Sequence, residues 1–193
     1  MSDAIFSGDT SLLVIDIQER LLKAMPDDSM QRCLHATKTL VELAGEFDAD
    51  IVYTEQYPDG LGPTEESLLA TLEEEGADRV EKTSFDACSA PDFRDYLIEF
   101  PKRIVVCGME THVCVYQTVR ELLERRHEII VPFDATISRR DDYHDNGLQL
   151  MDRLGATITN YETLVFDGLQ TSENPAFKRF SKMVQAGPEK QTR

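Results

Sequence analysis

The stretch Leu12-Leu13-Val14-Ile15 is a continuous apolar run near the start of the chain. Four consecutive apolar residues without polar alternation are typical of a strand that is buried on both of its faces. Such strands occur in parallel sheets that are covered by helices on both sides. The run therefore predicts an α/β domain built on a parallel sheet.

The rest of the body repeats this pattern, because strand-like runs alternate with amphipathic segments. Further strands are expected at 51–53, 79–82, 104–107, 128–133 and 156–159, and helices at 30–47, 64–75, about 89–100, about 113–123 and 141–154. The Pro- and Gly-rich segment 58–63 is expected to be loop. Strands alternating with helices of this length indicate βαβ units. We predict a Rossmann-like, three-layer α/β/α fold with a central, mostly parallel six-stranded sheet.

The length of 193 residues is that of about one domain, and the sequence contains no internal repeat or interdomain linker. Residues 1–170 carry the alternating pattern and are assigned to the domain. Residues 171–193 lose it, and we expect a C-terminal tail that is mobile or in contact with another subunit.

The charge is strongly acidic: 20 Lys and Arg against 36 Asp and Glu give a net charge of −16. Residues 171–193 hold five basic and two acidic residues, so the tail is +3 and the body is −19. A field of this sign repels phosphate backbones and anionic lipid. The charge therefore predicts neither a nucleic-acid partner nor a membrane partner.

Composition and the N-terminal sequence also limit the class of protein and its cellular compartment. An apolar fraction of 41% is too high for a disordered chain, and no apolar run approaches the roughly 18–20 residues of a membrane helix. The N-terminus lacks the basic start and apolar stretch of a secretion signal. Four cysteines in a chain of this size indicate free thiols. We predict a cytoplasmic protein.

Three polar positions follow strand-like runs at one edge of the predicted sheet. Ligands of open parallel sheets bind outside the carboxyl ends of the strands. Asp16 follows the first run, Lys82 ends the third, and Cys114 lies just after the fourth. A carboxylate, an amine and a thiol are thus candidates for one crevice. Taken singly, Asp16 has the alternative of capping a turn, and Lys82 that of a solvated surface lysine.

Of the three positions, Cys114 is the one for which the sequence gives the strongest evidence of a functional role. Buried cysteines usually act as small hydrophobic residues, and we interpret Cys33, Cys88 and Cys107 in this way. Cys114 instead falls in the first turn of a predicted helix after Gly108, where the helix dipole and free backbone N–H groups favour thiolate. The junction is similar to a nucleophile elbow with sulfur in place of the serine oxygen.

The histidines favour no metal site and no direct catalytic pair. The four are scattered, without a His-x-His or His-Glu-x-x-His pattern, and there is no Cys-x-x-Cys. His112 lies two residues before Cys114, and on a helix such side chains diverge by about 200° at ~3.6 residues per turn. No Gly-rich phosphate loop is present. We predict neither a metal nor a cofactor.

Three segments, taken together, resemble the isochorismatase-like cysteine hydrolase superfamily over roughly residues 10–170. They are Val14-Ile15-Asp16-Ile17-Gln18, Lys82-Thr83-Ser84-Phe85, and Gly108-Met109-Glu110-Thr111-His112-Val113-Cys114-Val115. Thr54-Glu55-Gln56-Tyr57-Pro58 and Gly60-Leu61-Gly62-Pro63 resemble the branch called isochorismatase domain-containing proteins.

The resemblance implies an Asp16–Lys82–Cys114 catalytic triad. Cys114 would attack a carbonyl carbon, Asp16 would move the proton, and Lys82 would hold the charges in place. The N–H groups of Glu110 and Cys114 would form the oxyanion hole, next to a cis Met109–Glu110 peptide bond. The residues implied to support the triad are Gln18, Met109 and Thr111.

Departures from the family narrow the expected function. Nicotinamidases of the superfamily carry an Asp-x-His metal set after the second strand, and 54–58 holds no histidine. True isochorismatases lack the nucleophilic cysteine, so Cys114 favours an amide or ureido C–N bond of a small molecule. The alternative is a non-catalytic binding or assembly protein on the same fold. A nuclease is a third hypothesis, which the acidic body opposes.

The resemblance also implies a homo-oligomer, as a dimer, tetramer or larger ring. The loop at 56–63 and the tail at 171–193 are the candidate contacts between subunits.

Overall fold

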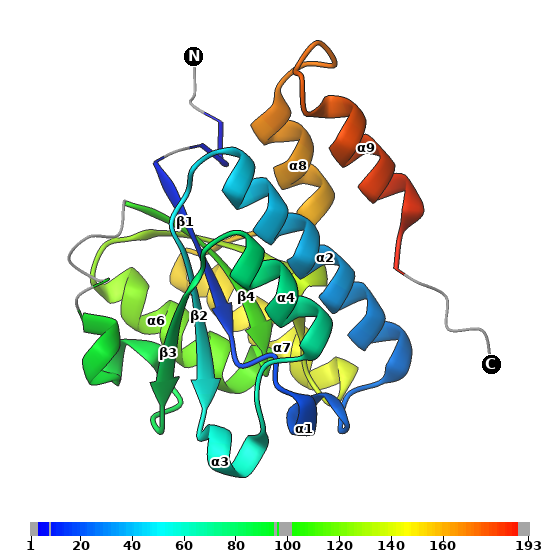
Figure 1. Cartoon of the computed structure of the whole chain (residues 1–193). Helices are drawn as coiled ribbons and strands as arrows, with labels where there is room; N and C mark the ends of the chain where they lie inside the picture. The colour runs from blue at the N-terminus through cyan, green and yellow to red at the C-terminus, as the bar shows by residue number, and fades with distance from the viewer. Residues whose placement is uncertain (1–3, 8, 95, 97–101, 189–193) are drawn as a thin grey trace.

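A seven-stranded parallel sheet forms the middle layer of the computed structural model, which describes residues 4–7, 9–94, 96 and 102–188 (Figure 1). Six strands follow the order β3-β2-β1-β4-β5-β7, and β6 pairs with β4. The strands are β1 Thr10–Ile15, β2 Ile51–Gln56, β3 Asp78–Lys82, β4 Arg103–Met109, β5 Glu128–Pro132, β6 Thr136–Ile137 and β7 Thr157–Thr159.

All six strands expected from the sequence are present, and β6 is an addition. β6 has only two residues, so it gives no periodic signal in the sequence. It pairs with Gly108 and Met109 at the carboxyl end of β4. The expectation that 58–63 is entirely loop is wrong, because Pro58–Leu61 forms the one-turn helix α3 with its proline at the first turn.

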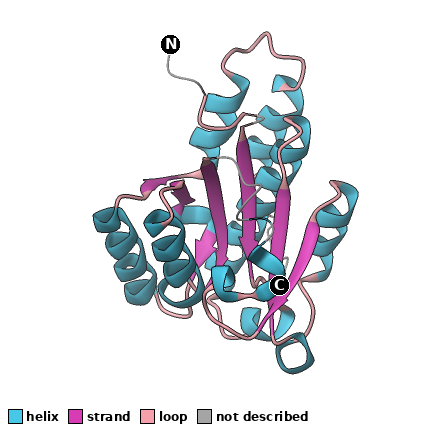
Figure 2. Ribbon diagram, turned by 90° about the vertical axis from the view of Figure 1, so that its left-hand side faces the viewer, coloured by secondary structure: helices cyan, strands magenta, loops and turns pink. Residues whose placement is uncertain are grey.

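Helices cover both faces of the sheet, as Figure 2 shows from the side. They are α1 Glu19–Leu22, α2 Asp27–Glu46, α4 Glu66–Glu74, α6 Tyr116–Glu124, α7 Asp141–Leu154, α8 Tyr161–Leu169 and α9 Phe177–Ala186. The helix predicted from Ser89 to about Phe100 falls partly outside the described residues, and Ala87–Ser89 and Pro91–Phe93 are 3₁₀ turns. Among the described residues, no helix is both long enough and apolar enough to span a membrane.

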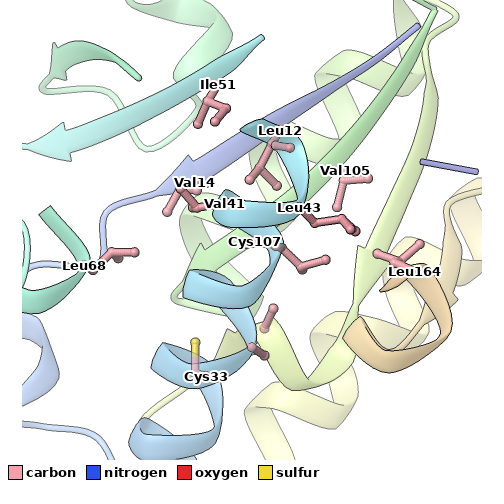
Figure 3. Packing of buried hydrophobic residues seen from close by; sticks show 14 of the residues in the cluster. Leu12, Val14, Cys33, Val41, Leu43, Ile51, Leu68, Val105, Cys107 and Leu164 are labelled. Atoms are coloured by element: carbon pink, nitrogen blue, oxygen red, sulfur yellow. The ribbon is translucent and has the colours of Figure 1, made fainter. Parts of the chain in front are cut away.

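Alternate residues of β1 belong to two separate hydrophobic cores. Leu12 and Val14 pack with Val41 and Leu43 of α2 on one face (Figure 3). Leu13 belongs to the opposite core, which includes residues of α6 and α7. Burying a side chain such as leucine contributes about 1.5–3 kcal/mol. The central strand is therefore stabilised from both sides, as the unbroken apolar run predicts.

The tail contains a helix that packs on the body, which corrects the expectation of a mobile segment for residues 177–186. Phe180 of α9 is fully buried, and Arg179 forms an ion pair with Glu42 of α2 at 2.6 Å. The sequence holds a helical signal here, because Phe177, Phe180 and Val184 recur on one face. A contact of the tail with another subunit stays a prediction.

Candidate active site

Asp16 and Lys82 form a buried ion pair at the carboxyl ends of their strands. Asp16 directly follows β1 and Lys82 is the last residue of β3. Lys82 Nζ lies 2.6 Å from Asp16 Oδ2, and neither side chain has exposed surface. Two charges removed from water are tolerated only when they are paired and hydrogen-bonded. The two strand-end residues nominated from the sequence thus meet.

Residues of β2 complete the hydrogen bonds of this pair. The Thr54 hydroxyl donates to Asp16 Oδ1 at 2.7 Å, and Gln56 Oε1 accepts from Lys82 Nζ at 2.8 Å. β2 lies between β1 and β3, and residues two apart on a strand share a face. Neither Thr54 nor Gln56 was among the residues predicted for the site. Their spacing at the end of a predicted strand is the signal that could have found them.

Gln18, predicted to support the triad, acts on Gln56. Gln18 Oε1 accepts from the backbone N–H of Gln56 at 2.8 Å, and Gln18 Nε2 donates to the carbonyls of Gln56 at 3.1 Å and Gly62 at 2.6 Å. Gln18 therefore links the chain after β1 to the end of β2. Its effect on Lys82 passes through the Gln56 side chain.

Asp16 has a left-handed backbone, with φ of +52°. This region is uncommon for residues other than glycine, and aspartate tolerates it better than most. The Asp16 carbonyl accepts from the Gln18 N–H at 2.8 Å, so the chain leaves the sheet in a tight turn immediately after β1. The turn places the carboxylate at the edge of the sheet, where strain of this kind is often found at functional sites.

Cys114 lies in a turn, residues 108–115, that leads from β4 into α6. Gly108 has a φ of +122°, and a Cβ there would lie 2.1 Å from the carbonyl oxygen of Ile15, so only glycine fits beside β1. The Met109–Glu110 peptide bond is cis, as the resemblance implied. Thr111–Val115 is π-helical, a wider turn than the α-helical one expected from the sequence.

The Cys114 thiol is protonated at rest, which corrects the expectation of a thiolate. Burial, followed by the negative charge of Asp16, raises the pKa of Cys114 from 9.0 to about 12, and the positive charge of Lys82 opposes this. A hydrogen bond to Asp16 also favours the thiol. Burial and the carboxylate therefore outweigh the helix start.

The other three cysteines are free and buried, and their pKa values are raised as well. Burial raises the pKa of Cys33 to about 12, and it also raises the pKa values of Cys88 and Cys107. Ionisation alone consequently does not distinguish Cys114. What distinguishes it is the contact of its thiol with the Asp16–Lys82 pair.

Three consecutive residues of the 108–115 turn are hydrogen-bonded to residues 138–144. We call this segment, 138–144, the clasp. The Glu110 carboxylate accepts from both the guanidinium and the backbone N–H of Arg139. The bonds are Arg139 Nη1 to Glu110 Oε1 at 2.9 Å, Arg139 N to Glu110 Oε2 at 3.0 Å, Thr111 Oγ1 with His144 Nδ1 at 2.8 Å, and His112 Nδ1 with Ser138 Oγ at 3.0 Å. Glu110 and Thr111 were predicted for the site from the sequence, but their partners in the clasp were not.

Gly147 allows α7 to press directly against the turn. A Cβ at this position would lie 3.1 Å from backbone atoms of Thr111 and His112. We expect Gly147→Ala to lose about 1 kcal/mol of stability, because overpacking costs about 1–3 kcal/mol while the helix gains up to ~1 kcal/mol from alanine.

For the hydrolysis that the resemblance implies, turnover should fall about tenfold, because a small displacement of the turn would misplace Cys114. Chemical denaturation and a turnover assay measure the two effects. Asn146→Ala, at the neighbouring exposed position of α7, is the control that should change neither. Unchanged turnover in Gly147→Ala would contradict the packing argument.

The contacts of the His112 ring are with Tyr143 and Ser138, which does not favour His112 as a base for Cys114. Its ring lies 4.9 Å from that of Tyr143, centroid to centroid, and burial lowers its pKa. With Nδ1 held by Ser138, the ring is bound to the clasp. Within the described parts of the chain, no group of three or more His, Cys, Asp or Glu side chains could hold a metal ion.

Comparison with known proteins gives matches over nearly the whole chain. The model of the isochorismatase domain matches residues 10–163. The secreted isochorismatase effector Isc1 of Phytophthora sojae is 31% identical over 176 residues, covering 90% of this chain and 83% of that protein. Isochorismatase domain-containing protein 2 of Rattus norvegicus is 29% identical over 93% of this chain and 83% of its own length.

A solved structure also superposes on nearly the whole chain. The structure described as the MAR1 ribonuclease of Caenorhabditis elegans superposes with a TM-score of 0.84 and 28% identity, covering 97% of this chain and 96% of that one. The three-layer architecture and the order of elements are therefore shared with known relatives.

Proposed function

This chain belongs to the isochorismatase family, and from that premise we propose that it is a small-molecule hydrolase that breaks an amide or ureido C–N bond through Cys114. The observation that carries the proposal is the contact of the Cys114 thiol with the buried Asp16–Lys82 pair. A nucleophile, a proton acceptor and a fixed cation in one place are the parts that covalent acyl transfer needs.

In the proposed first step the proton leaves the thiol as the sulfur attacks. Because the resting thiol is neutral, Asp16 takes the proton while Cys114 Sγ bonds to the carbonyl carbon. When the tetrahedral intermediate collapses, Asp16 gives this proton to the departing nitrogen. An amine or ammonia leaves, and the acyl group remains on Cys114 as a thioester.

In the proposed second step water hydrolyses the thioester. Asp16, again a carboxylate, takes a proton from the attacking water, and the carbonyl–sulfur bond breaks. The sulfur regains a proton from Asp16, and a carboxylic acid is released. For a ureido substrate the acid is a carbamic acid.

Lys82 has a positioning and electrostatic role in this scheme. Its ammonium donates to Asp16 Oδ2, to Gln56 Oε1 and, at 3.2 and 3.3 Å, to the carbonyls of Ser84 and Phe85. Its charge favours the negative charge that develops on Cys114 Sγ. With four acceptors around it, the ammonium is held in one place throughout the reaction.

The oxyanion of each intermediate is proposed to bind at the N–H groups of Glu110 and Cys114. Preorganised donors of this kind lower the barrier because they are aligned before charge develops. The clasp supports this arrangement, since it fixes Glu110, Thr111 and His112 by side-chain hydrogen bonds. Met109, fully buried, anchors the other side of the turn.

A panel of small amides and ureido compounds, assayed for ammonia release, tests the proposal. The wild type is expected to release ammonia from some members and to show an acyl adduct on Cys114 by mass spectrometry. The adduct should be absent from Cys33, Cys88 and Cys107, which serve as controls within the same molecule. Cys88→Ala should remain active. Equal ammonia release by Cys114→Ala would overturn the mechanism.

We do not propose a nuclease, although the superposed C. elegans protein is described as a ribonuclease. The body of this chain carries a charge of −19 and opposes a phosphate backbone. For the compartment we propose the cytoplasm, because the four cysteines are free and buried. The relative Isc1 is described as secreted.

A homo-oligomer is also proposed, with contacts at the edge that carries the site. Tyr57 and Phe85 follow β2 and β3 and are 56% and 54% exposed, and Tyr57 lies in the loop predicted to contact another subunit. Light scattering should give a mass above that of one chain. Tyr57→Ser with Phe85→Ser should lower it, and Leu154→Ser, at an exposed position on α7, should not. A wild type that is monomeric at all concentrations would contradict this prediction.

A further inference from the structure

A cavity of about 340 Å³ lies beside the clasp. Its wall is formed by the first turns of α2 and α7 and by the chain from Phe133 to Ser138. None of the triad residues lines it, but Ser138 and His144 of the clasp do. The volume is within the roughly 300–1,000 Å³ of small-molecule sites. The cavity is thus separate from the proposed catalytic centre and shares two residues with its support.

The wall holds one positive charge without a carboxylate partner. Arg32 donates to Ser29 Oγ at 2.9 Å, and within the described ranges it forms no ion pair. Its charge nevertheless reaches the cavity, because it contributes to the lowered pKa of His144, after burial as the main cause. Among the residues that line the cavity, Arg32 is the only lysine or arginine.

One negative charge of the wall is also free. Asp141 begins α7 and makes no ion pair with any residue that the structure describes, while its neighbours Arg140 and Asp142 pair with each other at 2.8 Å. Asp134 is already engaged, since it accepts from the Tyr161 N–H at 2.9 Å and burial raises its pKa. Arg32 and Asp141 are therefore the two charges available to a ligand.

These two charges decide between classes of ligand. A simple anion would meet Asp141, and a simple cation would meet Arg32. A neutral apolar molecule would cover both charges without pairing them, which is costly. An ammonium carboxylate satisfies both, and its ion pairs would be charge-assisted hydrogen bonds. The exposed ring of Phe133 and the side chain of Ile137 offer an apolar wall beside them.

We propose that this cavity is a second binding site, which takes a small zwitterion of the α-amino acid type. Its carboxylate binds Arg32, its ammonium binds Asp141, and an apolar side chain rests on Phe133 and Ile137. His144 bonds Thr111 through Nδ1 and also lines the cavity. A bound zwitterion therefore touches a residue that holds the 108–115 turn.

The binding test uses Cys114→Ala, in which no amide can be turned over, so it is independent of the proposed hydrolysis. The probes for calorimetry are leucine, leucinamide, which lacks the carboxylate, and 4-methylpentanoate, which lacks the ammonium. Leucine is expected to bind at least about tenfold more tightly than either analogue, because each loses one charge-assisted contact. Either analogue binding as tightly as leucine would overturn the proposal, and so would no leucine binding at millimolar concentrations.

Charge-removing variants and the NMR signals of histidine rings test whether leucine binds in this cavity. Arg32→Gln and Asp141→Asn, both at exposed positions, should each weaken leucine binding by about tenfold or more, while Arg120→Gln on α6 should not. The ring resonances of His144 should shift on titration with leucine, and those of His127, directly before the amino end of β5, should not. Binding that leaves His144 unmoved, or that survives both charge removals, would place leucine elsewhere and overturn the proposal.

Discussion

Asp16→Asn is expected to lower hydrolytic turnover by about 10²–10⁴-fold, the usual contribution of a general acid–base group. The same substitution should speed alkylation of Cys114 by iodoacetamide at pH 8. The charge of Asp16 and its hydrogen bond both raise the pKa of the thiol, so their removal lowers that pKa while Lys82 still favours thiolate. A more reactive thiol in a less active protein would separate proton transfer from mere ionisation.

The matched control for Asp16→Asn is Glu55→Gln. Glu55 is also a buried strand carboxylate, 2% exposed, and pairs with Arg79 at 2.6 Å. Glu55→Gln should lower stability, but it should change neither the alkylation rate of Cys114 nor hydrolytic turnover. Slower alkylation in Asp16→Asn, or turnover close to that of wild type, would contradict the role assigned to Asp16.

Lys82→Met is expected to lower the free energy of unfolding by about 3–5 kcal/mol, the cost of leaving one member of a buried pair uncompensated. Asp16 has no exposed surface, so water cannot replace the lost ammonium. Chemical denaturation measures the change. Lys23→Met, at an exposed position, should stay within about 0.5 kcal/mol of wild type.

The double variant Asp16→Asn with Lys82→Met distinguishes a structural pair from a catalytic one. Removing both charges should recover part of the stability lost in Lys82→Met, because no unpaired charge remains. Turnover should stay as low as in Asp16→Asn. Recovery of turnover together with stability would mean that the pair serves only the fold, and this would favour the alternative of a binding protein.

The apolar runs were sufficient to predict the sheet. Leu12-Leu13-Val14-Ile15 has too many consecutive apolar residues for a half-exposed strand, and the structure buries all of them. The rule that sheet ligands gather at carboxyl ends then nominated Asp16 and Lys82, and the two side chains meet. Local sequence decides which segments are strands and which side chains stand at their ends, since both depend on residue types within a single strand.

Contacts between distant segments were not predictable in the same way. Thr54 and Gln56 bond to Asp16 and Lys82 only because β2 lies between β1 and β3. The hydrogen bonds between the clasp and the 108–115 turn join residues about 30 positions apart in the sequence, and no periodic pattern marks these residues. The helix in the tail was missed because its apolar face is short and its partner is α2, far away in the chain.

The sequence by itself determined the layered fold, the order of its strands along the chain, and which carboxylate, amine and thiol stand at strand ends. Only the tertiary structure decided the state of the thiol. Cys114 at the start of a helix predicts a lowered pKa, but packing buries the sulfur beside Asp16, and both effects raise the pKa to about 12. The reason is physical: a helix start acts over one turn of local backbone, whereas burial and a neighbouring charge depend on which distant segments meet.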